Sequence, residues 1–111
     1  MKKKIYIAGK VTGLNPKEVH LKFKTAEEEL TARGFESVNP ITLVNNWHAT
    51  WEDAMKKCIA ALVMVDGVYL LPCCDNSPGA RWEIDIAARL KIPTFKKVDE
   101  VYQLIIITEQ L

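Results

Sequence analysis

The residues with the clearest chemical potential lie in one run, DNSPGARWE, at positions 75–83. Ser77 is a good helix N-cap and Pro78 suits the first helical position, so a helix is predicted to begin here. The N–H groups of its first turn can bind a phosphate or another anion, and Gly79 lets a ligand approach the backbone. Glu83 follows within two turns and can point into the same crevice if its face is not packed on the sheet. The plain alternatives are a helix start without a ligand and a solvated carboxylate.

These residues must be positioned by elements that alternate between strand and helix along the chain. Apolar runs predict strands at residues 4–8, 35–39, 64–71 and 92–95. Helical spacing predicts helices at residues 17–33 and 79–90, and another after a Thr50 N-cap with Asp53 three positions on. That middle helix is predicted to bury Trp51, Met55, Cys58, Ile59 and Leu62, and the helix after Gly79 to turn Ala80, Ile84, Ala87 and Ala88 inward. Residues 41–50 are predicted as a loop, residues 98–104 as helical, and residues 105–107 as a helix end or a strand.

Alternating strands and helices predict right-handed β-α-β units and a parallel sheet. We expect an α/β fold, a three-layer Rossmann-like (flavodoxin-like) sheet of four or five strands with helices on both faces. In such sheets ligands bind beyond the carboxyl ends of the strands, which here are followed by residues 9–15, 39–47 and 72–80. The length of 111 residues predicts a single domain, 1–111. A chain this short buries a modest fraction of its surface, so a homodimer or larger homo-oligomer is expected.

The overall charge is nearly balanced, with 15 basic and 14 acidic residues and a net charge of +1. This balance gives no indication of a nucleic-acid or membrane partner. The three lysines at positions 2–4 are interpreted as a solubilising flank, with nucleic-acid binding as the alternative. No apolar run approaches the roughly 20 residues of a membrane span, and none has the form of a signal peptide.

The cysteines and histidines do not form a recognisable metal site. Cys58, Cys73 and Cys74 are odd in number and include an adjacent pair, which argues against a disulfide framework and fits a reducing cytoplasm. Neither this spacing nor the two separate histidines, His20 and His48, is typical of zinc binding. We therefore expect a cytoplasmic protein with no metal and no cofactor.

Several segments together carry a resemblance to a known family. They are IYIAGKVTGL at 5–14, VNPI at 38–41, residues 51–55, DGVYLLP at 66–72, and SPGARWE at 77–83 with Ala87 following. In order and spacing they resemble a family of small phage and bacterial proteins of unknown function (DUF4406). That family is similar to nucleoside 2-deoxyribosyltransferases and deoxynucleoside 5′-monophosphate N-glycosidases. The resemblance spans residues 4 to 93.

The resemblance implies a catalytic role for three residues. Glu83 matches the glutamate nucleophile of those enzymes, which attacks C1′ of a 2′-deoxyriboside and forms a glycosyl-enzyme ester. Asp53 matches an acidic residue that could assist the leaving base, and its alternative is an ordinary first-turn helix acid. Tyr6 matches a tyrosine that orients the nucleophile, and its alternative is a half-buried strand aromatic. An elevated pKa of Glu83 is expected only if the crevice is dry.

The resemblance also implies substrate contacts along the carboxyl edge of the sheet. Ser77 and Gly79 would hold the sugar 5′-oxygen or a 5′-phosphate. A base could stack on Trp47, whereas the helical spacing of Trp51 favours core packing for that residue. The remaining candidate substrate-binding residues are Gly9, Lys10 and Thr12 in the first loop and Asn39 after the second strand.

Two functions follow from this interpretation. The first is an N-glycosidase or deoxyribosyltransferase acting on 2′-deoxynucleosides or their 5′-monophosphates. The alternative is a non-catalytic nucleotide-binding protein, such as a phage-encoded sequestering or sensing protein, that uses the same crevice. Loss of activity on Glu83→Gln discriminates between them, because a binding protein would keep its affinity for the ligand.

Overall fold

In the computed structural model, parallel strands form one sheet in the order β2-β1-β3-β4. The structure describes residues 2–72 and 76–104. Within them the strands are β1 (Lys4–Ala8), β2 (Glu36–Val38), β3 (Gly67–Leu70) and β4 (Thr94–Phe95), and every neighbouring pair is parallel. The order reverses between β1 and β3, so the topological switch point, where such sheets bind ligands, lies at the carboxyl ends of these two strands. The predicted α/β class is confirmed.

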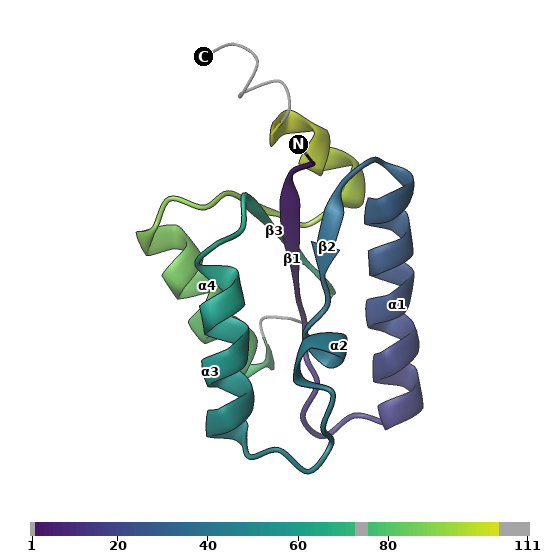
Figure 1. Cartoon of the computed structure of the whole chain (residues 1–111), viewed down its shortest axis with the longest axis vertical. Helices are drawn as coiled ribbons and strands as arrows, with labels where there is room; N and C mark the ends of the chain where they lie inside the picture. The colour runs from purple at the N-terminus through teal and green to yellow at the C-terminus, as the bar shows by residue number, and fades with distance from the viewer. Residues whose placement is uncertain (1, 73–75, 105–111) are drawn as a thin grey trace.

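Helices cover both faces of the sheet (Figure 1). On one face lie α1 (Pro16–Ala32) and the 3-10 segment η2 (Val98–Tyr102); α2 (Pro40–Val44), α3 (Trp51–Leu62) and α4 (Pro78–Arg89) pack on the other. Each face has its own buried cluster, and β3 is buried at all its positions because helices lie on both sides of it. The cluster under α3 and α4, which positions the candidate site, contains Tyr6, Ala8, Cys58, Leu62, Val65, Val68, Leu70, Ala80 and Ala87.

Helix starts follow the capping chemistry that the sequence predicts. The Ser77 hydroxyl accepts a hydrogen bond from the Ala80 N–H at 3.2 Å, and Thr50 caps α3 by accepting from the Asp53 N–H at 3.1 Å. At the end of α1, Gly34 has a φ of +86°, a left-handed conformation that glycine adopts without steric cost. These caps fix where α3 and α4 begin at the carboxyl edge of the sheet.

Three predicted elements differ in extent from the observed ones. Residues 40–44 form the short helix α2, although the sequence predicted the end of a strand and then a loop there. The helix forms because Asn39 caps it and Pro40 starts it. β3 begins at Gly67 rather than at residue 64, because α3 continues to Leu62 and a turn follows, with the Val65 N–H donating to the Leu62 carbonyl. Residues 98–102 form a 3-10 rather than an α-helix, and the tail at 105–107 lies outside the described residues.

Two helix faces also differ from the prediction. Trp51 was predicted to be buried but is 44% exposed. Of the five positions of α3 predicted to face inward, Cys58 and Leu62 are buried. In α4 the buried positions are Gly79, Ala80, Glu83 and Ala87, whereas Ile84 is half-buried and Ala88 exposed. The inward face of α4 therefore carries a carboxyl group.

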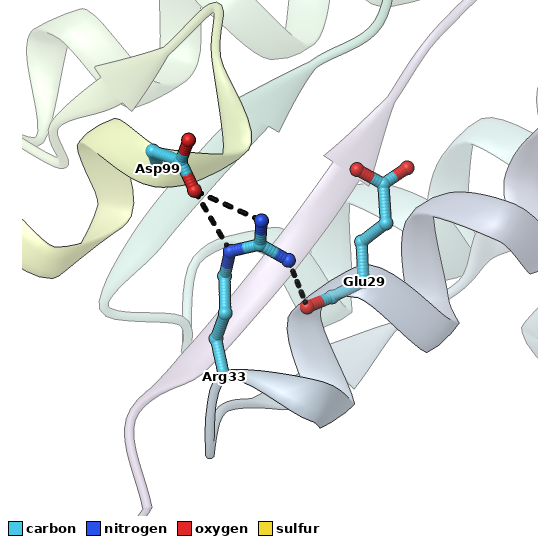
Figure 2. A network of polar contacts seen from close by, with 3 residues as sticks. All are labelled: Glu29, Arg33 and Asp99. Carbon is cyan, nitrogen blue, oxygen red and sulfur yellow. Dashed lines mark hydrogen bonds and ion pairs between the residues drawn. The ribbon is translucent and has the colours of Figure 1, made fainter.

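The C-terminal segment is tied to α1 by a set of polar contacts (Figure 2). Arg33 donates from Nε and Nη2 to one carboxylate oxygen of Asp99, at 3.1 and 2.9 Å, and from Nη1 to the Glu29 carbonyl at 2.9 Å. Val101 of η2 is completely buried in the cluster on the α1 face. The polar contacts and the burial of Val101 together hold η2 against the sheet.

Candidate functional site

Glu83 lies on the side of α4 that packs against the sheet, so the sequence-based condition for a side chain that points into the crevice is not met. Its helix neighbours on this side are Gly79, four residues before it, and Ala87, four residues after it, so the three share one face. Small residues at both flanking positions bring α4 close to the strands and leave the longer Glu83 side chain directed at β1. The residue is only 5% exposed. A carboxyl group so deeply buried requires a hydrogen-bond partner.

Tyr6, at the centre of β1, supplies that partner. Its hydroxyl donates a hydrogen bond to Oε2 of Glu83, and Tyr6 itself is 0% exposed. The two residues are 77 positions apart in the chain and meet because β1 lies in the middle of the sheet, beneath α4. The structure therefore brings together two of the three predicted catalytic residues.

Burial changes the ionisation of both groups. Desolvation raises the pKa of Glu83 from 4.5 to about 7, and the hydrogen bond from Tyr6 opposes this rise. Burial, followed by the nearby Glu83 and Cys58, raises the pKa of Tyr6 well above its ordinary value, so its hydroxyl keeps its proton. Glu83 is thus a carboxyl group poised to gain or lose a proton near neutral pH, which is typical of functional carboxyls. An elevated pKa of Glu83 was expected only in a dry site, and the burial of Glu83 agrees with that expectation.

Cys58 is a third member of this group that the sequence analysis did not assign to the site. It lies on α3, is almost fully buried, and belongs to the same buried cluster as Tyr6. Burial raises the pKa of its thiol, the contact with Tyr6 lowers it, and the nearby Glu83 raises it. The sequence could have indicated a place in the site through the predicted inward position of Cys58, which directs its thiol toward the sheet that carries Tyr6.

Asp53 is exposed in the first turn of α3 and is not brought to Glu83. Trp51, Met55 and Cys58, at spacings of four and three, share the side of α3 that meets α4 and the sheet. Asp53 follows Trp51 by two positions, so it points roughly 160° away around the helix axis. Its observed contact is the capping hydrogen bond from its backbone N–H to Thr50.

The start of α4 is packed against α3. A Cβ added to Gly79 would lie 3.2 Å from the Met55 sulfur and 3.6 Å from Nε1 of Trp51, so a larger residue here would require the Met55 side chain to shift. The Trp51 ring in turn meets Trp82 edge to face, at 6.5 Å between ring centroids. Since Pro78 has no N–H and the Ala80 N–H bonds to Ser77, the first turn keeps the Gly79 N–H without a partner among the described residues.

The candidates in the first loop have mixed surroundings. A Cβ at Gly9 would lie 3.0 Å from Leu71 and 3.1 Å from Phe23, so a larger residue here would require these core side chains to shift. Lys10 is half-buried, and its carbonyl accepts a hydrogen bond from Nζ of Lys22 at 3.2 Å. Thr12 is exposed in the same loop.

Asn39 and Trp47 follow β2 and differ in availability. Asn39 is buried, and both ends of its amide are engaged, since Oδ1 accepts from the Ile41 N–H at 3.0 Å and Nδ2 donates to Glu27 at 3.1 Å. Trp47 is exposed, with its ring open to solvent contact. Asn39 therefore caps α2, and Trp47 presents an exposed ring.

Two other classes of site are absent from the described residues. Over residues 2–72 and 76–104, no group of three or more His, Cys, Asp or Glu side chains is arranged to hold a metal ion. No helix in this part of the chain has the length and apolar character needed to cross a membrane.

Comparison with known proteins supports the fold assignment. No curated protein matches the chain. Among solved structures, the chain is similar to the 2-deoxyribosyltransferase of the psychrotolerant bacterium Bacillus psychrosaccharolyticus, with a TM-score of 0.62 and 19% sequence identity. The match covers 82% of this chain and 69% of that chain, and it shows a shared Rossmann-type fold. Residues 3–96 match the domain of unknown function DUF4406, which confirms the resemblance seen in the sequence, and the protein belongs to this family.

Proposed function

We propose that the protein cleaves the N-glycosidic bond of 2′-deoxynucleosides or their 5′-monophosphates through Glu83, as an N-glycosidase or a deoxyribosyltransferase. The observation that carries this proposal is the buried Glu83 carboxyl, bonded to Tyr6 and with a pKa of about 7. It lies in a fold shared with a 2-deoxyribosyltransferase. A carboxylate held in an apolar site is poorly solvated, which strengthens it as a nucleophile when it is ionised.

The proposed reaction has two displacements at the same carbon. Tyr6 engages Oε2 of Glu83, so Oε1 is the oxygen that attacks C1′. The C1′–N bond breaks as the C1′–O bond forms, and the base leaves with the bonding electron pair and takes up a proton from solvent. Water or a second base then attacks C1′, loses its proton, and restores the Glu83 carboxylate. Two inversions at C1′ give net retention of configuration.

We propose that the substrate enters from the carboxyl edge of the sheet, where α3 and α4 begin. The Gly79 N–H is the first-turn donor that remains for a 5′-oxygen or 5′-phosphate, close to the capping residue Ser77. Lys10 and Thr12 would approach from the first loop, and Trp47 offers an exposed ring for stacking on the base. Asp53 is exposed and turned away from α4. It would therefore assist the leaving base only if the base extends past the α3–α4 interface.

The test is a chromatographic assay of the purified protein with a panel of 2′-deoxynucleosides and 2′-deoxynucleoside 5′-monophosphates. Release of free base is the expected result. A parallel reaction with a second free base distinguishes transfer, which yields a new nucleoside, from hydrolysis, which yields free sugar. Absence of release, together with ligand-induced thermal stabilisation, would instead support the non-catalytic nucleotide-binding protein.

Tyr6→Phe is expected to shift the pH dependence of base release toward higher pH. The hydrogen bond from Tyr6 lowers the pKa of Glu83, so its removal raises that pKa above about 7. The rate depends on the ionised carboxylate, so the midpoint of the pH–rate profile should rise by roughly one unit. Tyr69→Phe is the matched control, because Tyr69 is a tyrosine of the neighbouring strand that faces the α1 side. An unchanged midpoint in Tyr6→Phe would contradict the assigned role.

We further propose that the protein is cytoplasmic and forms a homo-oligomer. Exposed tryptophans at positions 47, 51 and 82 are large apolar surfaces that a second copy could cover. Light scattering at micromolar concentration is expected to give a mass above that of the single chain, and a monomer would contradict the oligomer.

A further inference from the structure

Trp51 lies where the two helices over the candidate site begin. It is the first residue of α3, and Nε1 of its ring lies 3.6 Å from the place of a Cβ on Gly79, in the first turn of α4. The reaction proposed above gives this ring no role. Helical spacing predicted that it would be buried, yet almost half of its surface is exposed. An aromatic ring at this place either packs the two helices together or also contacts a ligand.

The Trp51 ring borders the turn of α4 toward which Glu83 leans. The Cα–Cβ bonds of a helix tilt toward its N-terminus, so the Glu83 side chain lies over the turn that contains Gly79. Gly79 and Glu83 share the buried face of α4, one turn apart. From α3, the groups nearest to Gly79 are the Trp51 ring and the flexible side chain of Met55. An approach to Glu83 from the carboxyl edge of the sheet therefore passes beside Trp51.

The geometry of displacement places the leaving base on the same side. In an attack with inversion, the incoming oxygen and the leaving nitrogen lie on opposite sides of C1′. Glu83 is buried against the sheet, so it attacks from the inner side of the sugar. The base then lies on the outer side, toward the edge at which α3 and α4 begin. This is the level of the chain at which Trp51 is exposed.

The contacts of the Trp51 ring leave it available to a ligand. Trp82 meets it edge to face, with the ring planes at 81°, and such a pair covers at most one face of one ring. Nε1 is the atom of Trp51 nearest to the Cβ position of Gly79. Over residues 2–72 and 76–104, no acceptor bonds to this indole N–H. The ring thus keeps both open aromatic surface and a hydrogen-bond donor beside the turn that precedes Glu83.

We propose that Trp51 binds the base of the substrate, by stacking of its ring on the base and by donation from its indole N–H. Every base has an aromatic face, so the contact accepts purines and pyrimidines. Trp51 would thereby favour a sugar that carries an aromatic leaving group over a sugar phosphate without one. The inference rests on the proposed function, because it takes the position of the base from attack by Glu83 on C1′.

The experiment measures binding by calorimetry in Glu83→Gln, which cannot turn over the ligand. The probes are 2′-deoxyadenosine 5′-monophosphate, 2′-deoxycytidine 5′-monophosphate and the base-free 2-deoxyribose 5-phosphate. Trp51→Ala and Trp51→Phe are added to this parent protein. Tyr102→Ala is the matched control, because Tyr102 is 42% exposed against 44% for Trp51. Its ring meets that of Phe35, as Trp51 meets Trp82, but on the α1 side of the sheet.

Trp51→Ala is expected to weaken the binding of both nucleotides by roughly tenfold and to leave the binding of the sugar phosphate unchanged. Trp51→Phe should recover part of the loss, because phenylalanine can stack but has no N–H to donate. Tyr102→Ala should bind all three probes as the parent does. A purely structural effect of Trp51 would instead alter all three affinities alike.

Equal nucleotide affinities in the parent and Trp51→Ala, or an equal loss for nucleotides and sugar phosphate, overturn the inference. Trp51→Phe decides if the sugar phosphate binds too weakly to compare, since binding no better than that of Trp51→Ala overturns it. If Trp51→Ala does not fold, Trp51→Phe must still lose affinity for the nucleotides alone. A loss confined to Trp47→Ala also overturns it.

Two further outcomes separate this inference from the other proposals. A lower mass by light scattering in Trp51→Ala, with unchanged nucleotide affinity, would assign the ring to a contact between copies and overturn the inference. Nucleotides that do not bind the parent at all overturn it together with the proposed function. A loss specific to the nucleotides, in a protein whose wild type releases no base, would support the role of Trp51 and refute the cleavage reaction.

Discussion

Glu83→Gln is expected to lower base release by at least about 10³-fold, to the background of the assay. The amide keeps the shape of the side chain and an oxygen that can accept the Tyr6 hydrogen bond, but it cannot form the ester with C1′. The buried cluster around Glu83 should therefore keep its packing while the chemical step is lost. Chromatography of the released base, with enzyme in large excess over the detection limit, measures the effect.

Two controls make this result specific to the nucleophile. Glu28→Gln carries the same substitution at an exposed position of α1 and should retain wild-type activity. Ligand-induced thermal stabilisation should survive in Glu83→Gln, because binding at the edge of the sheet does not require the carboxylate. Full activity in Glu83→Gln would remove Glu83 from the reaction, whatever the fold of the protein.

Glu83 should also make the protein less stable as the pH rises. Its folded-state pKa of about 7 lies above the value of 4.5 for the unfolded chain. Below 4.5 both states hold the proton, and the group has no effect. Between 4.5 and 7 the unfolded chain releases its proton while the folded protein keeps it, so the free energy of unfolding falls by about 3 kcal/mol. Above 7 both states are ionised and the loss is complete.

Glu83→Gln should abolish this dependence. At a pH above 7 the variant is expected to be more stable than the wild type by about 3 kcal/mol, and below 4.5 the two should be equal. Denaturant-induced unfolding at a series of pH values gives the difference between the two proteins, in which the contributions of the other titrating groups cancel. Parallel stability curves for wild type and Glu83→Gln would show that Glu83 is not held in a dry environment.

A destabilising carboxyl group is informative because a simple packing role would not explain it. An apolar residue at position 83 would continue the face formed by Gly79, Ala80 and Ala87 and would avoid the cost of desolvation. The fold instead places a glutamate there, with the Tyr6 hydroxyl as its hydrogen-bond donor. Buried groups that lower stability are commonly found at functional sites, where the chemistry depends on them.

The α/β architecture could be predicted because its determinants are local. Period-two and period-3.6 patterns alternate along the chain, and the caps at Thr50 and Ser77 mark the helix starts by short-range hydrogen bonds. The short helix α2 was missed because Pro40 both ends a strand and starts a helix. In that segment the Asn39 cap, a side-chain contact over two residues, decided the outcome.

The inward face of α4 was harder to predict because two faces satisfy the same periodicity. Ala80 with Ile84 and Ala88 forms an apolar i, i+4, i+8 row, whereas Gly79, Glu83 and Ala87 form the adjacent row, with a carboxylate in it. Hydrophobicity favours the first row. The second row is buried, because its small residues allow close approach to the sheet and Tyr6 bonds to the carboxyl group between them.

The convergence of Cys58 with Tyr6 and Glu83 depends on long-range geometry that a sequence does not display. Each residue comes from a different element, and their meeting depends on the strand order and on how α3 packs beside α4. The position of Asp53 shows the same limit. Its type and place at the helix start suited an acid, but the face of α3 that meets α4 is the one with Trp51, Met55 and Cys58.

The most direct test of the account is to look for the covalent intermediate on Glu83. The wild-type protein is mixed with a substrate identified in the panel, quenched in acid, and analysed by intact mass and peptide mapping. The account predicts a protein species heavier by one 2-deoxyribosyl unit, with the added mass on the peptide that contains Glu83, and no such species in Glu83→Gln. Base release by the wild type with the adduct on another residue, or undiminished in Glu83→Gln, would contradict it.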